Sequence, residues 1–190
     1  MLSATPCKGF SGINNKAKGM NGKDGELIRA ATKIIEKVRA RNPQVKILME
    51  NVVLNDNLKD QQGEMNELIG ITFKGIKASD QGASQQRERM VATNITDIDM
   101  LEKKDAIDPN LLLGRMAEAK HRMTPCLMAA GSATKATVRV RDAPGMRFRD
   151  ANNDEKDALQ GYPVGSSEGF RGDIAEMTRT KVMGNIWNYH

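Results

Sequence analysis

The chain has 190 residues, of which 39% are hydrophobic, and its mean hydropathy is -0.54. This length suits one ordinary domain or a large part of a bigger one. The sequence has no run close to the roughly 18 apolar residues of a membrane helix, and no basic segment precedes an apolar one at the N-terminus. We therefore expect a cytoplasmic protein, or a nuclear one if the host is eukaryotic.

The formal net charge of +5 permits a polyanionic partner but does not require one. Basic residues are concentrated early, since residues 1–50 hold ten Lys or Arg against four Asp or Glu. A solvated basic surface would give the same pattern. The two cysteines, Cys7 and Cys126, follow no secretory signal. A disulfide framework is therefore not expected, and Cys7 can be a reactive thiol.

The first part of the chain predicts a strand over residues 2–7, a helix over 26–41 and a strand over 45–53. Between the first two, the glycine-rich residues 8–25 predict a mobile loop. Asp24 is expected to cap the helix, which Asn42-Pro43 should end. A strand, a helix and an apolar strand are typical of an α/β fold with a parallel sheet that is buried on both faces.

The rest of the chain predicts shorter elements. They are helices at 57–69, 109–121, 152–160 and 171–183, strands at 71–79, 90–95 and 136–140, and turns at 131–132 and 161–163. The pattern weakens between about 96 and 146, where we expect a small separate subdomain.

Cys7 follows Pro6 at the end of the first predicted strand and enters the glycine-rich loop. This is a plausible position for a nucleophile, because the sheet would hold the thiol while the loop closes over it. The alternative is a buried cysteine that acts as a small hydrophobic residue. The fragment alone leaves both interpretations open.

Glu50 interrupts the apolar run of residues 47–53. A carboxylate is costly to bury without a partner or a function, so Glu50 is a candidate proton donor. An ion pair with a nearby Lys or Arg is the structural alternative. Arg87 and Arg89, two residues apart at the start of a predicted strand, should point the same way and could both bind an anion or a base carbonyl. A surface salt-bridge pair is the alternative for them.

The order of these motifs resembles the cytosine-5 DNA methyltransferases. It runs from Pro-Cys through Glu-Asn-Val and Gln-x-Arg-x-Arg to an Arg with Glu six residues later, then Gly-Tyr-Pro and Gly-Asn. The segment from Pro6 to Leu27 is similar to the eukaryotic de novo branch, whereas Gly82 to Arg89 is more similar to bacterial and phage enzymes. The resemblance implies a phage or bacterial relative of that branch, such as a restriction-modification enzyme.

The resemblance implies a Rossmann-like sheet that binds S-adenosylmethionine as the methyl donor, with a target-recognition subdomain. Residues 1–95 would be the catalytic part, 96–146 the target-recognition region and 147–190 the return to the methyltransferase domain. The implied mechanism flips a cytosine out of double-stranded DNA and adds the Cys7 thiolate to ring carbon 6, so that carbon 5 takes the methyl group. Glu50 would contact ring nitrogen 3 and the exocyclic amine.

The resemblance assigns supporting roles to other residues. Arg89 would bind the base carbonyl, Arg87 would help to order the thiolate site, and Asn51 would brace the loop that carries Cys7. Ile13 lies where the family inserts a side chain into the space left by the flipped base, with an ordinary loop anchor as the alternative. The implied DNA contacts are Lys8, Ser11, Ile13, Lys16 and Lys18. The implied cofactor contacts are Pro6, Leu27, Asn185 and Trp187, and no metal is implied.

The sequence departs from the family in the motif that binds the cofactor. The family's Phe-x-Gly-x-Gly turn is missing, because no two of the 17 glycines are separated by a single residue. Three explanations are open: an incomplete reading frame, a subunit whose missing N-terminal segment is supplied by a cofactor-binding partner, and a non-catalytic paralogue that binds DNA or an active methyltransferase. The transfer-RNA-methylating branch fits less well, since Pro125-Cys126-Leu127 does not match its Cys-Phe-Thr motif.

Overall fold

The computed structural model describes residues 1–5, 7–11, 14, 16–126 and 138–166. Backbone contacts divide the chain into unit 1, Met1–Ile76 with Glu88–Leu101, and unit 2, Lys77–Arg87 with Glu102–His190. Several sequence-based predictions fall on residues outside the described ranges. These are the roles of Pro6, Ile13, Asn185 and Trp187, the turn at 131–132 and the helix at 171–183.

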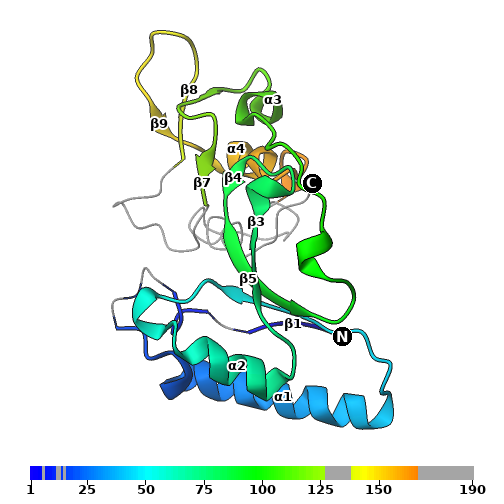
Figure 1. Cartoon of the computed structure of the whole chain (residues 1–190). Coiled ribbons are helices and arrows are strands. Elements are labelled where there is room, and N and C mark those ends of the chain that lie inside the picture. The colour runs from blue at the N-terminus through cyan, green and yellow to red at the C-terminus, as the bar shows by residue number, and fades with distance from the viewer. Residues whose placement is uncertain (6, 12–13, 15, 127–137, 167–190) are drawn as a thin grey trace. The chain divides into compact units, whose positions relative to one another are not determined.

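Unit 1 is built on a sheet with the strand order β1-β2-β5-β3 (Figure 1). Its strands are β1 (Leu2–Ala4), β2 (Leu48–Val52), β3 (Lys74–Lys77) and β5 (Glu88–Thr93). β1 pairs with β2 in parallel, which confirms the predicted strand-helix-strand unit. β5 runs antiparallel to β2, so the sheet is mixed rather than parallel throughout.

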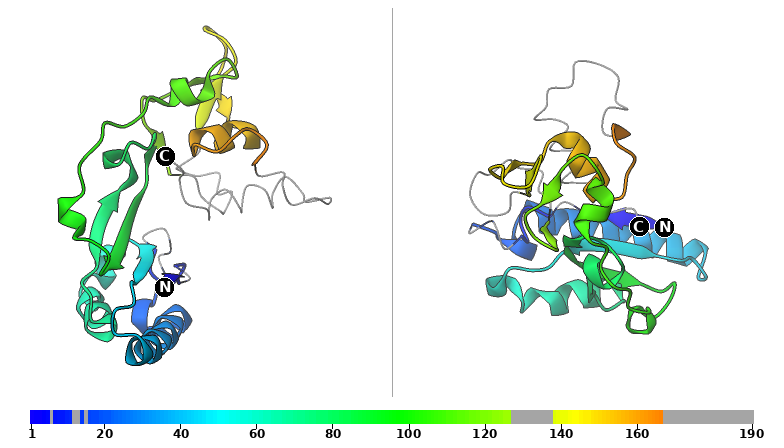
Figure 2. Two further views of the ribbon diagram at one scale, coloured as in Figure 1. Left: turned by 90° about the vertical axis from the view of Figure 1, so that its right-hand side faces the viewer. Right: turned by 90° about the horizontal axis from the view of Figure 1, so that it is seen from above.

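Two helices of unit 1 lie side by side (Figures 1 and 2): α1 (Lys23–Arg41) and α2 (Gln61–Ile69). Arg39 Nη1 donates a hydrogen bond of 2.7 Å to the carbonyl of Ile69, and Arg29 forms a 2.6 Å ion pair with Glu64. A short 3-10 turn precedes each helix: η1 (Gly19–Asn21) comes before α1, and η2 (Asp56–Leu58) comes before α2. A third turn, η4 (Ile98–Met100), follows β5. The two predicted helices are thus confirmed, although residues 57 and 58 belong to η2.

The prediction that Asp24 caps α1 is wrong. The helix begins earlier, at Lys23, with Gly22 as its N-cap and Asp24 within the first turn. The Asp24 carboxylate instead accepts a hydrogen bond of 2.6 Å from the backbone N–H of Gly9. An acidic residue remains favourable there because the helix N-terminus carries partial positive charge.

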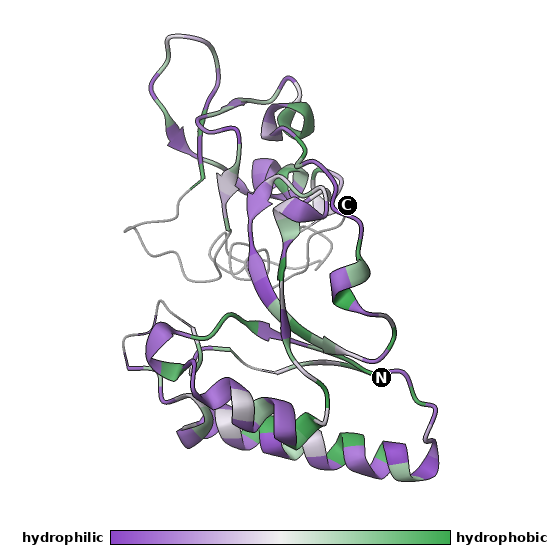
Figure 3. Cartoon of the chain, in the orientation of Figure 1, coloured by the Kyte–Doolittle hydropathy of each residue, from purple (hydrophilic) through white to green (hydrophobic). Residues whose placement is uncertain are grey.

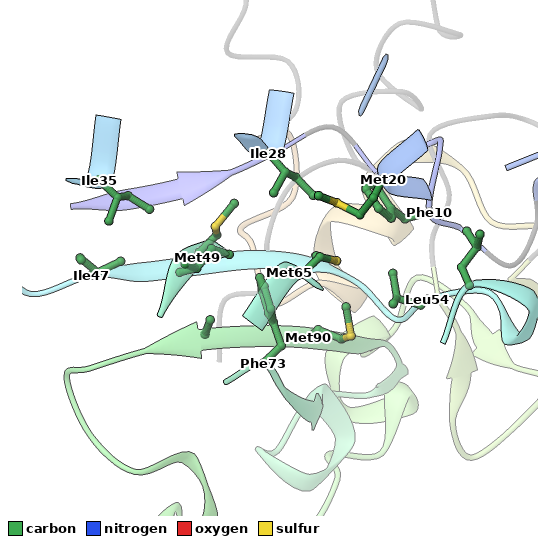
Figure 4. Packing of buried hydrophobic residues seen from close by; sticks show 13 residues of the cluster. Phe10, Met20, Ile28, Ile35, Ile47, Met49, Leu54, Met65, Phe73 and Met90 are labelled. Carbon is green, nitrogen blue, oxygen red and sulfur yellow. The ribbon is translucent and has the colours of Figure 1, made fainter. Parts of the chain in front are cut away.

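The main core lies between the two helices and one face of the sheet (Figure 4). In β2, Met49 and Asn51 are buried, whereas Glu50 is only partly buried. Successive strand residues point to opposite faces, so Met49 packs toward the α1 side and Glu50 points away from it. Figure 3 shows hydrophobic and hydrophilic residues alternating along α1, as expected for a helix with one buried face. The buried residues of this core are Phe10, Met20, Ile28, Ile35, Ile47, Met49, Leu54, Leu58, Met65, Ile69, Phe73, Met90 and Ala92.

The described part of unit 2 contains two small sheets and two short helices. Its elements are η3 (Ala78–Asp80), β4 (Gln85–Gln86), α3 (Pro109–Leu113), β6 (Glu118–Ala119), β7 (Thr124–Pro125), β8 (Arg139–Arg141), β9 (Arg149–Asp150) and α4 (Asn153–Leu159). β4 pairs in parallel with β7, and β8 lies between β6 and β9 in an antiparallel sheet. A second cluster of buried apolar side chains, which includes Leu113, Val140 and Leu159, holds this unit together.

The predicted helix at 109–121 is too long. It ends at Leu113, because Gly114 takes a positive φ of 56° and turns the chain toward β6. The predicted helix at 152–160 is confirmed as α4. Asn152 and Glu155 form a reciprocal capping box at its start, in which each side chain accepts a hydrogen bond from the other residue's backbone N–H.

The described residues contain no helix that is long and apolar enough to cross a membrane. Within the same ranges, no three His, Cys, Asp or Glu side chains are grouped so that they could hold a metal ion.

Substitution by alanine should have opposite effects on stability at two glycines that lie within helices. A Cβ at Gly25 would lie 2.2 Å from the carbonyl oxygen of Met20, whereas a Cβ at Gly63 would meet nothing within 4 Å. We expect Gly25→Ala to lower the free energy of unfolding by about 1–3 kcal/mol, because the backbone of η1 must move. Gly63→Ala should raise it by about 0.5–1 kcal/mol through helix propensity. Urea unfolding of both variants checks this, and equal effects would contradict the α1–η1 contact.

Glu155 should be the most important carboxylate for the stability of unit 2. Its side chain is 1% exposed and pairs with Arg149 at 2.7 Å while it also caps α4. Glu155→Ala is expected to lower the free energy of unfolding by about 2–4 kcal/mol, since both a cap and a buried ion-pair partner are lost. Asp150, which pairs with Arg139 at the surface, is the matched control. Asp150→Ala should change urea unfolding little, because exposed pairs contribute little.

Candidate active site

Cys7 lies just past β1, at the start of a turn. The backbone N–H groups of Phe10 and Ser11 both donate hydrogen bonds of 3.0 Å to the Cys7 carbonyl. Phe10 is fully buried in the unit 1 core, and its carbonyl accepts a hydrogen bond of 3.0 Å from the Asn55 N–H. The Cys7 turn is therefore anchored to the chain segment that follows β2. The thiol itself is free and partly exposed.

A second anchor holds the same turn through Gly9. The N–H of Gly9 donates to the Asp24 carboxylate, and the carbonyl of Gly9 accepts a 2.7 Å hydrogen bond from the N–H of Gly19. A Cβ at Gly9 would lie 3.1 Å from the Asp24 side chain, so this approach favours glycine. The turn after Cys7 is thus tied to the start of α1 as well as to the segment after β2.

Asn51 connects β2 to the residues that precede Cys7. Its side chain is fully buried, and its Nδ2 donates a hydrogen bond of 3.0 Å to Thr5 Oγ1. Its Oδ1 accepts from the Val52 N–H at 2.8 Å. The expectation that Asn51 braces the Cys7 loop is confirmed by this contact. Sequence analysis did not identify Thr5 as the partner, because a threonine two residues before a cysteine carries no distinctive signal.

Glu50 and Arg89 form an ion pair on the sheet face that points away from α1. Glu50 Oε1 lies 3.0 Å from Arg89 Nε, and the two side chains are 16% and 21% exposed. In the β2–β5 register Glu50 lies opposite Val91, while Arg89 lies opposite Val52, which makes the pair a diagonal one. The ion pair that the sequence left open as a structural alternative is therefore present.

This pair also has a chemical consequence. A carboxylate accepts hydrogen bonds, and a guanidinium donates them in a fixed planar arrangement. The Glu50–Arg89 pair therefore presents an acceptor beside donors, which complements a ligand edge that carries an amine and a carbonyl. A cytosine base has such an edge.

The strand register places the Cys7 segment and Glu50 at the same end of the parallel pair. Ala4, the last residue of β1, lies opposite Glu50. The chain then passes Thr5, which Asn51 holds, before it reaches Cys7. Open α/β sheets bind their ligands at the carboxyl ends of parallel strands, and both candidate residues lie there.

Arg87 lies outside the strands, between the end of β4 and the start of β5. It belongs to unit 2, whereas Arg89 belongs to unit 1. Its buried guanidinium donates a hydrogen bond of 3.4 Å to the Cys126 sulfur, and its carbonyl accepts from the Ala78 N–H. Sequence analysis missed Cys126 as this partner, since 39 residues separate the two. The role of Arg87 at the thiolate site stays a prediction.

The loop after Cys7 exposes its basic side chains. Lys8, Lys16 and Lys18 are all exposed, and none of them forms an ion pair with another residue in the described part of the loop and its surroundings. Ser11 is partly buried because it forms a β-bridge with Leu54. Three cations near one turn are therefore available to an anionic partner.

The Thr5–Asn51 hydrogen bond can be tested by an isosteric substitution. We expect Thr5→Val to lower the free energy of unfolding by about 1–3 kcal/mol, because the buried amide of Asn51 loses its partner. Thr5→Ser keeps the hydroxyl and is the matched control, with a smaller expected effect. Urea unfolding measures both variants. An unchanged free energy of unfolding for Thr5→Val would show that the hydrogen bond does not contribute.

Comparison with known proteins gives two findings about this chain. The family model for C-5 cytosine-specific DNA methylases matches residues 1–159, which include every described residue of the site above. No curated protein matches the sequence.

Solved methyltransferases share the fold at low sequence identity. The methyltransferase EhMeth of Entamoeba histolytica is 14% identical with a TM-score of 0.59, over 98% of this chain and 72% of that one. A candidate DNA modification methyltransferase encoded within an E. coli prophage is 14% identical with a TM-score of 0.58, over 98% and 74%. Dnmt2 of S. pombe is 12% identical with a TM-score of 0.57, over 98% and 72%. With a mixed α/β sheet of the methyltransferase kind and a family match over most of its length, the chain belongs to the C-5 cytosine-specific DNA methylases.

Proposed function

We propose that this chain carries the catalytic and target-recognition portion of a DNA cytosine-5 methyltransferase, with Cys7 as the nucleophile. The main support is the Glu50–Arg89 pair at the end of the β1–β2 pair, next to the segment that carries Cys7. The Asn51–Thr5 hydrogen bond fixes that segment against β2. Nucleophile, acceptor and donor groups thus come from adjacent elements of unit 1.

In the proposed reaction the Cys7 thiolate forms a bond to carbon 6 of the cytosine ring. The ring electrons move toward nitrogen 3 and carbon 5. Glu50 stabilises this change as a carboxylic acid, whose O–H donates its proton to nitrogen 3 while its other oxygen accepts a hydrogen bond from the exocyclic amine. Arg89 donates hydrogen bonds to the base carbonyl. Carbon 5 then becomes nucleophilic enough to take a methyl group. Loss of the carbon 5 proton and elimination of the Cys7 sulfur restore the aromatic ring.

S-adenosylmethionine supplies an electrophilic methyl group when it is bound. Of the four residues implied as its contacts, Leu27 on α1 is the described one, and its side chain is 46% exposed. An exposed apolar side chain fits a contact with an apolar part of such a ligand. We propose that a cofactor-binding segment or a partner subunit supplies the rest of the cofactor site.

Double-stranded DNA is the proposed substrate. The target base must leave the stack before a thiolate can reach carbon 6, so the enzyme would flip it. Lys8, Lys16 and Lys18 would then meet phosphates, together with Ser11, and Ile13 would occupy the vacated space. Residues 1–95 and 147–190 would form the methyltransferase part, residues 96–146 the target-recognition region, and Arg87 would help to order the thiolate site.

Covalent trapping tests the proposed chemistry. A duplex that contains 5-fluorocytosine blocks the proton loss, so an active chain should form a stable adduct when S-adenosylmethionine and a cofactor-binding segment of the family are supplied. Cys7→Ser should abolish the adduct and keep DNA binding. Cys126→Ser is the matched control and should keep the adduct, because the serine hydroxyl can still accept the hydrogen bond that Arg87 donates to Cys126.

The alternative is a non-catalytic subunit that binds DNA or regulates an active methyltransferase. It predicts salt-sensitive DNA binding with no adduct in any variant. Denaturing gel electrophoresis and mass spectrometry of the cross-linked peptide separate the two outcomes. Loss of a cellular methylation signal in a Cys7→Ala strain would exclude the non-catalytic alternative.

A further inference from the structure

Asp24, in the first turn of α1, binds the backbone of the turn that follows Cys7. Its Oδ2 accepts a hydrogen bond of 2.6 Å from the N–H of Gly9, two residues after Cys7. A hydrogen bond to an ionised carboxylate is roughly twice as strong as one between neutral groups. A Cβ at Gly9 would lie 3.1 Å from both Cβ and Oδ2 of Asp24, so glycine permits this close approach. The contact therefore depends on both residues.

The turn after Cys7 is held together by its own backbone. The N–H groups of Phe10 and Ser11 both donate to the Cys7 carbonyl. Phe10 is fully buried in the cluster that also contains Met20, and both side chains are labelled in Figure 4. This anchor fixes the place of the turn, but a segment held at one point can still rotate. A second point, at Gly9, is needed to set its orientation.

Gly9 is held by two contacts with the helical layer of unit 1. Its carbonyl accepts a 2.7 Å hydrogen bond from the N–H of Gly19, the first residue of η1. The turn η1 is itself fixed, because the N–H of Met20 donates a 2.6 Å hydrogen bond to Gln61 Oε1. The contact from Gly19 uses main-chain atoms alone, whereas the contact from Asp24 uses a side chain. Asp24 is therefore the support of Gly9 that a substitution can remove.

The helix α1 has other sources of stability. Its first turn contains a second acidic residue, Glu26, which also interacts favourably with the partial positive charge at the helix N-terminus. Ile28 and Ile35 are fully buried in the core. Substitution of Asp24 leaves these contributions in place. The hydrogen bond to Gly9 thus contributes more to the order of the turn than to the helix.

The orientation of this turn matters for the proposed chemistry. A bond between the Cys7 sulfur and ring carbon 6 forms from a geometry in which the two atoms are about 3–3.5 Å apart and aligned. A displacement of about 1 Å can slow such a reaction by about a hundredfold. A contact two residues from the nucleophile is close enough to cause or prevent such a displacement.

We propose that Asp24 is a positioning residue for the Cys7 nucleophile. Through the N–H of Gly9 it fixes the orientation of the turn, and hence the direction from which the sulfur approaches the base. The inference rests on the proposed function for its reaction. It goes further because it assigns control of the covalent step to a side chain of α1 that acts through the backbone and not on the reacting atoms.

The rate of adduct formation tests this role. It is measured in a single turnover on the 5-fluorocytosine duplex, with S-adenosylmethionine and the cofactor-binding segment supplied. Asp24→Ala should slow adduct formation by about tenfold to a hundredfold at saturating DNA and leave the half-saturating DNA concentration unchanged. Asp24→Asn removes the charge but keeps an oxygen acceptor, so it should recover most of the rate. Glu26→Ala removes an exposed acidic residue from the same helical turn and is the matched control, with the wild-type rate.

Two further measurements identify Gly9 as the group through which Asp24 acts. Hydrogen exchange of the Gly9 amide, followed by NMR, should be faster in Asp24→Ala and close to wild type in Asp24→Asn. Gly9→Ala should also slow adduct formation, because its Cβ would crowd Asp24. Since both substitutions act on one contact, the double variant should lose less than the product of the two single losses.

Four results would overturn the proposal: an unchanged rate for Asp24→Ala, an equal loss for Glu26→Ala, an Asp24→Asn variant as slow as Asp24→Ala, or independent effects of Asp24 and Gly9. A change in the half-saturating DNA concentration alone would also overturn it, since that outcome indicates a DNA contact. Urea unfolding verifies that each variant is folded. A wild type that forms no adduct removes the proposed catalysis together with this inference, whereas a wild-type adduct that Asp24→Ala leaves unchanged removes this inference alone.

Discussion

The parallel pairing of β1 with β2 is the constraint on which the candidate active site depends. β1 has only three residues, and its register sets Ala4 opposite Glu50. That pairing brings the Cys7 segment to the strand that carries Glu50, and the backbone hydrogen bond from Asn55 to Phe10 holds the chain beside β2 after Cys7. The buried side chain of Asn51 extends the pairing by one step, since its bond to Thr5 continues the contact after β1 has ended. Short strands need such additional contacts because few backbone hydrogen bonds hold them.

The side chains of β2 point alternately to the two faces of the sheet, which explains how one strand contributes both to the core and to the candidate active site. Met49 and Asn51 face the helices, where apolar packing and a satisfied amide suit a buried environment. Glu50 faces the other way, where it remains 16% exposed and meets Arg89. A shift of one residue would put the carboxylate into the apolar core and Met49 outside. The core therefore fixes the direction in which Glu50 points.

The sequence predicted the parts of this fold that depend on local pattern. The strand, helix and strand of residues 2–53, the helix α4 and the brace by Asn51 were all identified, the last through the family resemblance. Contacts between residues far apart in the sequence were missed. The local pattern does not indicate that Asp24 binds Gly9 or that Arg87 binds Cys126. The helix expected at 109–121 failed for a related reason. Its hydrophobic spacing continues past Gly114, but the backbone conformation of that glycine ends it.

The Glu50–Arg89 pair shows why a structural and a functional interpretation need not exclude each other. A partly buried ion pair is weak support for stability, because desolvation offsets much of the attraction, and apolar residues of similar size often serve as well. Glu50 stands among Ile47, Met49 and Val52, so an apolar residue would suit its position on hydrophobic grounds. What an apolar pair could not provide is an acceptor beside donors at the carboxyl end of the β1–β2 pair. The same contact that makes Glu50 tolerable in this strand thus orients the carboxylate and the guanidinium for a polar ligand such as a cytosine.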